Sequence, residues 1–259
     1  MPTVDMLVRT GLATLLLTAV AVLVLAAGGI RGWWSPTVAI ARAGMQLAAL
    51  SLVLGGIIGD PVWVGVGLCV MFAVAVAVST RRAGEPLAAS WRAAVALGIG
   101  VGVAGGSVFL TGAVACTPRY LLAVGAMVIG NAMTVSSLAG RRFAQLRADR
   151  WAEVEGWLAL GATPRRATRD LGRIAVYDAL VPGIDQTKTT GLVVLPGAFV
   201  GAVFGGLSPL EAGRFQLVVL AAILAAGAIT ATITVSLTSG RMWTAFSSRR
   251  GADAGRPLE

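Results

Sequence analysis

Histidine is absent from the sequence, lysine occurs once, at Lys188, and charged residues fill only 13% of the 259 positions. Soluble domains carry roughly 25% charged residues, so this chain has too little polar surface to cover a globule in water. The single lysine follows Thr187, so the phosphate-binding loop G-x-x-x-x-G-K-[ST] is missing. The two cysteines, Cys69 and Cys116, lie in apolar segments and form neither a disulfide framework nor a zinc motif. These absences exclude a water-soluble domain and a P-loop ATPase.

Apolar residues make up 56% of the chain, and the mean hydropathy is +0.82. A membrane-spanning helix needs about 20 apolar residues, and seven uncharged stretches approach or exceed that length. They are Gly11–Ile30, Ala43–Gly59, Pro61–Thr80, Ala93–Pro118, Tyr120–Gly140, Thr189–Leu210 and Phe215–Gly240. The second stretch is the shortest and can extend back to Trp34. We therefore predict an all-α polytopic membrane protein of about seven transmembrane helices, with residues 1–259 forming a single transmembrane domain.

Basic residues are distributed unevenly between the two sides of these seven stretches. Loops 1–2, 3–4 and 5–6 and the C-terminal tail hold 18 of the 21 basic residues, whereas Arg9, Arg119 and Arg214 lie on the other side. Cytoplasmic loops carry the excess of arginine and lysine in membrane proteins. The pattern predicts a multi-pass protein of the cell inner (plasma) membrane, with its N-terminus outside and its C-terminus in the cytoplasm.

Residues 141–188 form the one long polar stretch, which we expect between spans five and six. Apolar residues recur in it at helical spacing, and Gly161 is suited to end that first helix. Thr163 and Pro164 are suited to the N-cap and first position of a second helix, which should run to about Leu180 and end at Pro182-Gly183. The prediction is a helix-turn-helix elbow. Two interpretations stay open: an amphipathic pair lying on anionic lipid, or a docking element for a cytoplasmic protein.

The spacing from Glu155 to Gly161 resembles the EAA-type coupling motif of ABC transporter permeases, in which a short cytoplasmic helix docks on the ATPase subunit. Residues 171–174 read Leu-Gly-Arg-Ile, so the usual I-x-L-P ending is absent. Three further stretches are more specific: Pro118-Arg119-Tyr120 with 127–134 (MVIGNAMT), 158–164 (LALGATP), and 181–197 (VPGIDQTKTTGLVVLPG). Together they resemble the FetB family of iron-export ABC permeases, which includes the plant aluminium-tolerance permeases. The resemblance runs from about Arg42 to Ser239.

This resemblance implies a non-catalytic permease subunit that works with a separate FetA-like ATP-binding subunit, which would bind ATP and Mg²⁺. One chain supplies one elbow and an ABC ATPase pair presents two grooves, so we expect a homodimer of this chain. Family members are linked to export of iron or of a nucleotide sugar, so metal and organic substrates both stay open. The residues implied in coupling to the ATPase are Glu153, Glu155, Gly161, Ala162, Thr163, Pro164, Arg165 and Arg166.

The seven stretches contain no acidic residue, and the chain contains no histidine. A tight Fe(II) site needs carboxylate or imidazole ligands, so we expect a low-affinity path, a chelate or a larger solute rather than a metal cage within the membrane, and the sequence identifies no metal ligands. The candidate path residues are Gln46, Met127, Asn131, Met133, Asp185, Lys188 and Pro196. Each has a simpler interpretation. Gln46 and Asn131 can form hydrogen bonds between helices, and Met127 and Met133 can serve in packing. Asp185 and Lys188 can form a surface ion pair at the mouth of span six, and Pro196 can produce a kink.

Glycines repeat every four residues at Gly98, Gly102 and Gly106 and at Gly197, Gly201 and Gly205. Such spacing allows close helix contact, and the two stripes are expected to pack either within the chain or at a dimer seam. Two other functions compete with an ABC permease. A stand-alone secondary transporter usually has ionisable residues at mid-membrane, which the seven stretches lack, and a membrane scaffold without transport activity is the third possibility.

Overall fold

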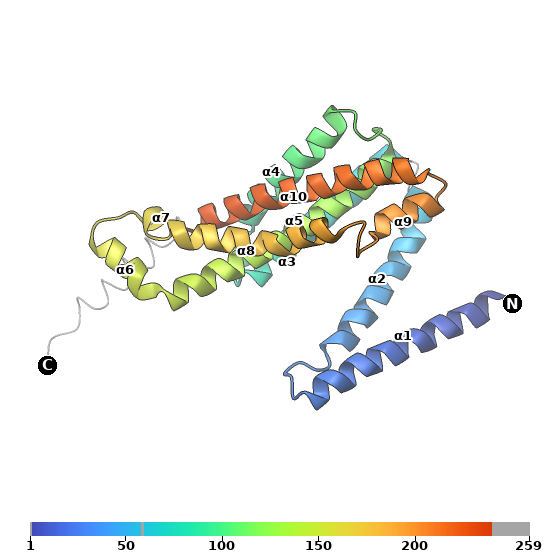
Figure 1. Ribbon diagram of the computed structural model, residues 1–259, viewed down its shortest axis with the longest axis horizontal. Coiled ribbons are helices and arrows are strands. Elements are labelled where there is room, and N and C mark those ends of the chain that lie inside the picture. Colours follow the sequence, from blue (N-terminus) through green and yellow to red (C-terminus); the bar gives the residue numbers. More distant parts are fainter. Residues whose placement is uncertain (1, 58–59, 240–259) are drawn as a thin grey trace. The chain divides into compact units, whose positions relative to one another are not determined.

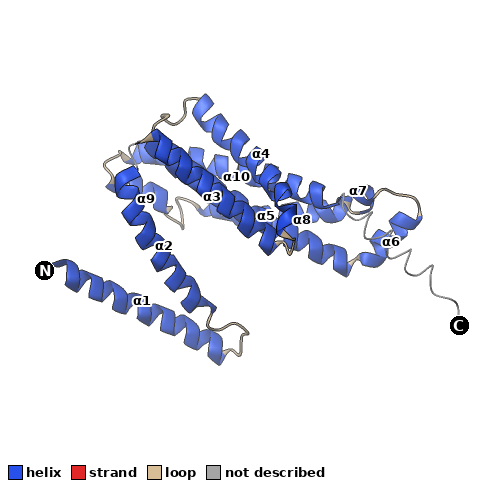
Figure 2. Ribbon diagram, turned by 180° about the vertical axis from the view of Figure 1, so that it is seen from behind, coloured by secondary structure: helices blue, strands red, loops and turns tan. Residues whose placement is uncertain are grey.

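A computed structural model describes the backbone of residues 2–57 and 60–239, and the side chains of 5–51 and 60–239. In these ranges the regular elements are helices, apart from an isolated bridge between Thr190 and Val194 (Figures 1 and 2). Contacts divide the chain into two units, Met1–Gly59 and Asp60–Glu259. The all-α architecture predicted from the sequence is confirmed.

The first unit is a helical hairpin of α1 (Pro2–Ala27) and α2 (Ser35–Ile57). The turn between the helices uses Gly29 and Gly32, which have φ values of +63° and +83°, a conformation that favours glycine. Most described side chains of the hairpin are exposed and apolar. Such surfaces suit lipid rather than water, so the hairpin has the character of two membrane helices.

The second unit is a bundle in which α10 packs against α4, α5 and α8, and α5 also packs against α3. Its long helices are α3 (Pro61–Arg82), α4 (Ser90–Leu110), α5 (Pro118–Asp149), α8 (Arg169–Thr189) and α10 (Pro209–Ser239). The short elements are η1 (Leu87–Ala89), α6 (Trp151–Ala159), α7 (Pro164–Ala167) and α9 (Gly197–Phe204). The helices α6 and α7 lie at one end of this bundle, which we call the elbow end (Figure 1).

Proline sets the starts of several of these helices. α3, α5, α7 and α10 each begin at a proline, whose fixed φ and missing N–H suit the first helical position. At α3 the side chain of Asp60 also accepts a hydrogen bond from the N–H of Val62, at 2.8 Å. These starts follow directly from local sequence, which explains why most helix boundaries lie close to the predicted ones.

Five helical segments are long and apolar enough to cross a membrane. They are Asp5–Ala27, Pro61–Arg82, Leu87–Leu110, Pro118–Asp149 and Pro209–Ser239. They agree with the first, third, fourth, fifth and seventh predicted spans. The second predicted span lies within α2, which begins at Ser35, next to Trp34. Residues 58–59 and 240, at the ends of the second and seventh spans, lie outside the described residues.

The sixth predicted span, Thr189–Leu210, was wrong. This segment contains only α9, whose eight residues reach about 12 Å, far short of a hydrocarbon core of about 30 Å. Instead α8 returns along the bundle from the elbow end, in contact with α5 and α10 (Figure 1). The sequence predicted a helix over the first part of α8, but a search for apolar runs did not mark it as part of the bundle, because this helix carries many charged residues. Pro196 accordingly lies at the N-cap of α9 and not at a kink within a span.

The predicted end of the second elbow helix at Pro182-Gly183 was also wrong, because α8 continues through Pro182 to Thr189. Proline removes one helical hydrogen bond, here the bond to the carbonyl of Asp178. Packing compensates for this loss, since small residues bring α8 close to its neighbours. Gly172 lies against Val235, and Gly183 lies against Leu224. The first elbow helix differs too: α5 runs on to Asp149, and α6 is a separate helix after a break at Arg150.

The closest approach between α4 and α10 occurs at Gly100. A Cβ atom there would overlap Oγ1 of Thr230 and lie 2.8 Å from the carbonyl oxygen of Ala226. The Thr230 hydroxyl donates to the carbonyl of Ala96 across the same contact, at 3.3 Å. The predicted stripe does not serve this purpose, because a Cβ at Gly102 or Gly106 would meet no atom within 4 Å.

The second glycine stripe also makes no close contact within the described part of the chain. A Cβ at Gly197 or Gly201 would meet no atom within 4 Å, and one at Gly205 would meet only carbonyl oxygens of α9 itself. In the described part of the bundle the tightest glycine contacts, at Gly100, Gly125 and Gly172, lie outside both stripes, whereas Gly98 makes an ordinary contact with Phe72 of α3.

Gly100→Ala should destabilise the bundle, whereas Gly102→Ala should not. Alanine raises helix propensity by about 0.8–1.0 kcal/mol over glycine, so Gly102→Ala is expected to leave the melting temperature unchanged or raise it. At Gly100 the added methyl group collides with backbone and side chain of α10, and overpacking costs about 1–3 kcal/mol. Thermal unfolding of both purified variants in the same detergent measures the difference. Equal melting temperatures would show that α4 and α10 do not meet at Gly100.

Candidate functional site

The turn at the tip of the elbow has the geometry that its sequence indicated. Gly161 has a φ of +85°, and the N–H groups of Gly161 and Ala162 donate to the carbonyls of Leu158 and Trp157, each at 3.0 Å. Thr163 is the N-cap of α7, where its hydroxyl accepts from the N–H of Arg166 at 3.4 Å. Glycine at the left-handed position and threonine at the cap fix how α6 turns into α7.

The elbow is anchored to the bundle by an apolar cluster. Val154 and Leu158 of α6 and Ala167 after the turn are buried together with Phe143 and Leu171. Phe143, at 0% exposure, belongs to the part of α5 that extends toward the elbow. The elbow is therefore a rigid continuation of α5 and α8 rather than a hairpin on a loose linker.

The opposite side of the elbow is exposed. Trp157 and Leu160 are 48% and 82% exposed, and Glu155, Arg165 and Arg166 are exposed beside them in the sequence. A tip that combines apolar and charged side chains suits contact with a protein surface, since aromatic and arginine residues are enriched in interfaces.

The remaining predicted coupling residues are Glu153 and Ala162. Glu153 forms an ion pair with Arg150 at 2.5 Å, with both side chains about half exposed, whereas Ala162 is half-buried in the turn. All eight predicted coupling residues thus lie within one short hairpin at the elbow end.

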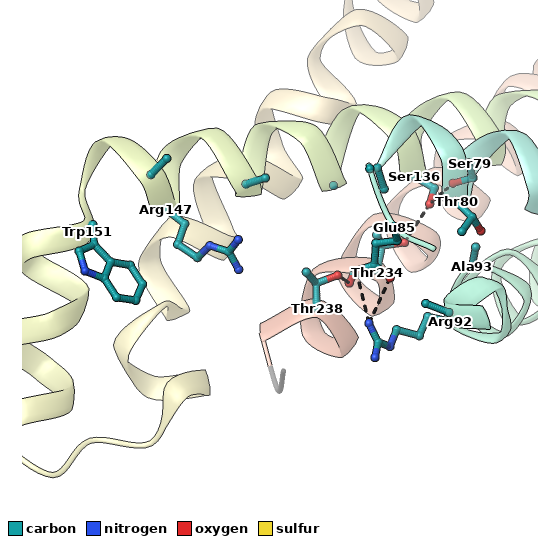
Figure 3. Close-up of a pocket in the computed structure, with 16 residues that line it drawn as sticks. Ser79, Thr80, Glu85, Arg92, Ala93, Ser136, Arg147, Trp151, Thr234 and Thr238 are labelled. Carbon is teal, nitrogen blue, oxygen red and sulfur yellow. Dashed lines mark hydrogen bonds and ion pairs between the residues drawn. The ribbon is translucent and has the colours of Figure 1, made fainter. Parts of the chain in front are cut away.

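A cavity of 770 Å³ lies between α3, α4, α5 and α10 (Figure 3). A chain of hydroxyl groups lines one part of it: Ser79 donates to Ser136 at 2.9 Å, and Ser136 bonds to Thr234 at 3.1 Å. Arg92 and Glu85 form an ion pair at 3.1 Å, with side chains 18% and 19% exposed. Figure 3 places Arg147 and Trp151 at the other side of the cavity, toward the elbow. This arrangement offers hydrogen bonds and charge to a polar solute.

Sequence reasoning missed this cavity. Ser79 and Ser136 lie 57 residues apart in the chain, and single hydroxyl residues in apolar helices usually bond to their own backbone. Only the packing of α3 against α5 brings them together. The sequence shows a polar run, residues 79–82, at the end of α3, but such runs also occur where helices simply reach the membrane surface, and Ser136 lies within α5.

Charged residues of α8 form three ion pairs: Asp178 with Arg142, Arg173 with Asp170, and Lys188 with Asp185. Nε of Arg142 on α5 donates to Oδ2 of Asp178 at 2.7 Å, which links the two helices that lead into the elbow. Nζ of Lys188 lies 3.2 Å from Oδ1 of Asp185, as the sequence indicated. Their predicted place at the mouth of a span was wrong, because Gly183 of α8 already lies against Leu224, the midpoint of α10. The seven predicted spans contain no acidic residue, but Asp178 and Asp185 lie on α8, a helix of the bundle outside those spans.

The other candidate path residues do not converge on one site. Met127 packs among Val124, Val128 and Val219, whereas Met133 packs on another cluster with Ala75 and Leu97.

Asn131 lies near Gly227, and Gln46 is exposed on α2 in the first unit. In the described part of the chain no group of three or more cysteine, aspartate or glutamate side chains is placed to hold a metal ion.

The sequence is similar to a family of membrane proteins. The model of UPF0014, an uncharacterised protein family, matches residues 8–243. UPF0014 membrane protein STAR2 of Oryza sativa subsp. japonica is 36% identical over 210 residues, which cover 80% of this chain and 72% of the relative. Protein ALUMINUM SENSITIVE 3 of Arabidopsis thaliana is 33% identical over 216 residues, covering 81% and 76%. No solved structure matches the chain.

A further relative carries a functional name. The probable iron export permease protein FetB of Escherichia coli (strain K12) is 31% identical over 144 residues, 56% of each chain. The resemblance to the FetB and aluminium-tolerance proteins noted from short motifs is thus confirmed over most of the sequence. With five long apolar helices and a family match over residues 8–243, this chain is a multi-pass membrane protein of the UPF0014 family.

Proposed function

We propose that this chain is the permease subunit of an ABC exporter whose ATP-binding subunit is a separate protein. The observation that carries the proposal is the elbow: a tight helical hairpin with an exposed tip, anchored by Val154 and Leu158 to the extension of α5. The relative FetB, named a probable iron export permease, supports it. ATP and Mg²⁺ would bind to the partner subunit, and this chain would contribute no catalytic residue.

The elbow end of the bundle would face the cytoplasm, where ATP is available. Arg141, Arg142, Arg147 and Arg150 on α5 and its end, together with Arg165 and Arg166, place positive charge at this end, which agrees with the usual cytoplasmic excess. The N-terminus would then lie outside. Replacing the predicted sixth span by α8 keeps the number of crossings odd, so the proposed orientation of both termini in the plasma membrane is unchanged.

We propose metal export as the first candidate activity and export of a polar organic solute or a chelate as the second. The relative named for iron export supports the first. The second is favoured by the cavity of Figure 3, whose hydroxyl groups and Arg92–Glu85 pair suit a hydrogen-bonding solute better than a bare cation. Transport assays in proteoliposomes with ferrous iron, an iron chelate and a polar solute of similar size distinguish these activities.

A stand-alone secondary transporter is the competing function. The position of Asp185 and Lys188 beside the middle of α10 supports it, since ionisable residues at that depth are typical of ion-coupled transporters. Dependence on the ATPase separates the two functions: an ABC permease transports only with its ATP-binding subunit and ATP, whereas a secondary transporter responds to an ion gradient alone.

Glu155→Ala and Gly161→Val should each uncouple ATP hydrolysis from transport while leaving the chain inserted in the membrane. Loss of Glu155 removes a charged contact at the docking surface. Valine at Gly161 is penalised by roughly 1–2 kcal/mol in the left-handed conformation, so the tip should shift. The measurement is stimulation of the partner's ATPase activity by reconstituted permease, together with substrate transport.

Gly112→Val is the matched control for the backbone strain. Gly112 has a φ of +67° and open space around it, as Gly161 has, but lies between α4 and α5 at the opposite end of the bundle. We expect normal coupling in this variant. If both elbow variants stimulated the ATPase like the wild type, the elbow would not be the coupling element.

Labelling of single cysteines should place the two ends of the bundle on opposite sides of the membrane. In a chain with Cys69 and Cys116 replaced by serine, Leu160→Cys at the elbow and Leu210→Cys at the start of α10 present side chains that are 82% and 75% exposed. A membrane-impermeant maleimide applied to intact cells should label position 210 and spare position 160. Labelling of position 160 under these conditions would reverse the proposed orientation.

A further inference from the structure

One face of α8 is both exposed and polar. Arg173, Tyr177, Asp185 and Lys188 are exposed at helical spacing along one side of α8, and we call them the polar face of α8. The side chains of Asp185 and Lys188 are 60% and 70% exposed, and Tyr177 is 64% exposed. The opposite face, with Gly172, Ala175 and Ala179, is buried against α5 and α10. The polar face therefore has no covering partner within the second unit.

The exposed faces of α3 and α4 have a different character. They present valine, isoleucine and tryptophan side chains: Trp63, Val66, Val70 and Val74 on α3, and Trp91, Val95, Ile99 and Val103 on α4. Such surfaces are suited to lipid. Among α3, α4 and α8, only α8 presents a row of exposed ionisable side chains at this depth, so its face has a different neighbour.

Contacts between helices place Asp185 and Lys188, the part of this polar face farthest from the elbow, near the middle of the bundle. α3 has 22 residues, about 33 Å, which matches the hydrocarbon core. Gly125 of α5 lies against Leu68 of α3, and Ser136 bonds to Ser79 near the end of α3. Asn131 therefore lies between these levels.

Asn131 and Leu180 both lie near Gly227 of α10, which sets Leu180 of α8 at the same level as Asn131. Asp185 is five residues farther from the elbow, about 7.5 Å, beside the centre of α3.

The ion pair within α8 does not satisfy these groups in lipid. Lysine has three donor hydrogens and a carboxylate accepts at about four sites, whereas Nζ of Lys188 and Oδ1 of Asp185 share one contact of 3.2 Å. Charged groups within membranes face a protein interior or water and pair with one another. The hairpin of α1 and α2 is a poor partner, because residues 10–51 contain no acidic side chain to meet Lys188.

We propose that the polar faces of α8 from two copies of this chain meet at a two-fold seam, with Asp185 of each copy close to Lys188 of the partner subunit. A two-fold interface brings the same patch together from both copies, so the patch must complement itself. α8 meets this requirement because acid and base stand three residues apart on one face. This inference rests on the dimer of the proposed function and identifies the helix that forms it.

Disulfide cross-linking tests the seam directly. In the chain with Cys69 and Cys116 replaced by serine, Tyr177→Cys and Ile174→Cys, which lie on the same side of α8 and are both exposed, should each give a covalent dimer on oxidation in native membranes. Val103→Cys, equally accessible on the lipid-type face of α4 with 51% exposure, is the matched control and should stay monomeric. A chain that is dimeric by native mass spectrometry but forms no dimer through either α8 cysteine would overturn the seam and leave the proposed function standing. A monomer that still stimulates the ATPase would overturn both the seam and the two-copy assembly.

Charge exchange provides the second test, and its readout is the cross-linked fraction of Tyr177→Cys. Asp185→Lys places like charges across the seam and should lower that fraction by about tenfold or more. The double variant Asp185→Lys with Lys188→Asp keeps the composition and the pair within the helix, so it should fold as the wild type does and recover the cross-link. If the single reversal kept full cross-linking but abolished transport, the polar face would line a path within one copy and the seam would be excluded.

Discussion

Lipid provides no hydrogen bonds, and the architecture of this chain follows from that constraint. Most of the described backbone lies in helices, whose backbone groups bond within the helix, and many hydroxyl side chains bond to their own helix or pair across helices. The Ser79–Ser136–Thr234 chain and the Thr230–Ala96 contact join α3, α4, α5 and α10 by such bonds. Polar groups are therefore concentrated where helices meet, and the largest exception, the face of α8, marks a surface that needs another partner.

Local sequence predicted the parts of the fold that depend on local chemistry. Prolines set helix starts, Gly161 and Thr163 set the turn of the elbow, and apolar runs marked five crossing helices. A helix was predicted up to about Leu180, but the length of α8 and its course along the bundle were not, because α8 is held in place by Gly172, Ala175 and Ala179 against α5 and α10, not by its own hydropathy. Its residues signalled a helix end at Pro182, and tertiary packing overrode that signal.

Of the candidate functional residues, those of the elbow were predicted from the sequence and those of the cavity were not. The elbow residues are neighbours in sequence, so spacing alone grouped them, and the resemblance to the FetB family gave them a role. The cavity of Figure 3 combines residues from four helices, and no spacing rule relates Ser79, Ser136 and Thr234. The two glycine stripes show the opposite error, since a small-residue repeat indicates only that close contact is sterically possible, and Gly100 makes the contact instead.

The continuity of α5 has a mechanical consequence. This helix is 32 residues long, about 48 Å, and its contact at Gly140 with Ala83 marks where its neighbour α3 ends. Nine further residues, about 14 Å, project beyond that point and carry the elbow. Phe143 and Leu146 in this projecting part pack against α8 and α10. One unbroken helix therefore joins the elbow to the Ser79–Ser136 bond and the cavity beside it, so the two places are connected without an intervening loop.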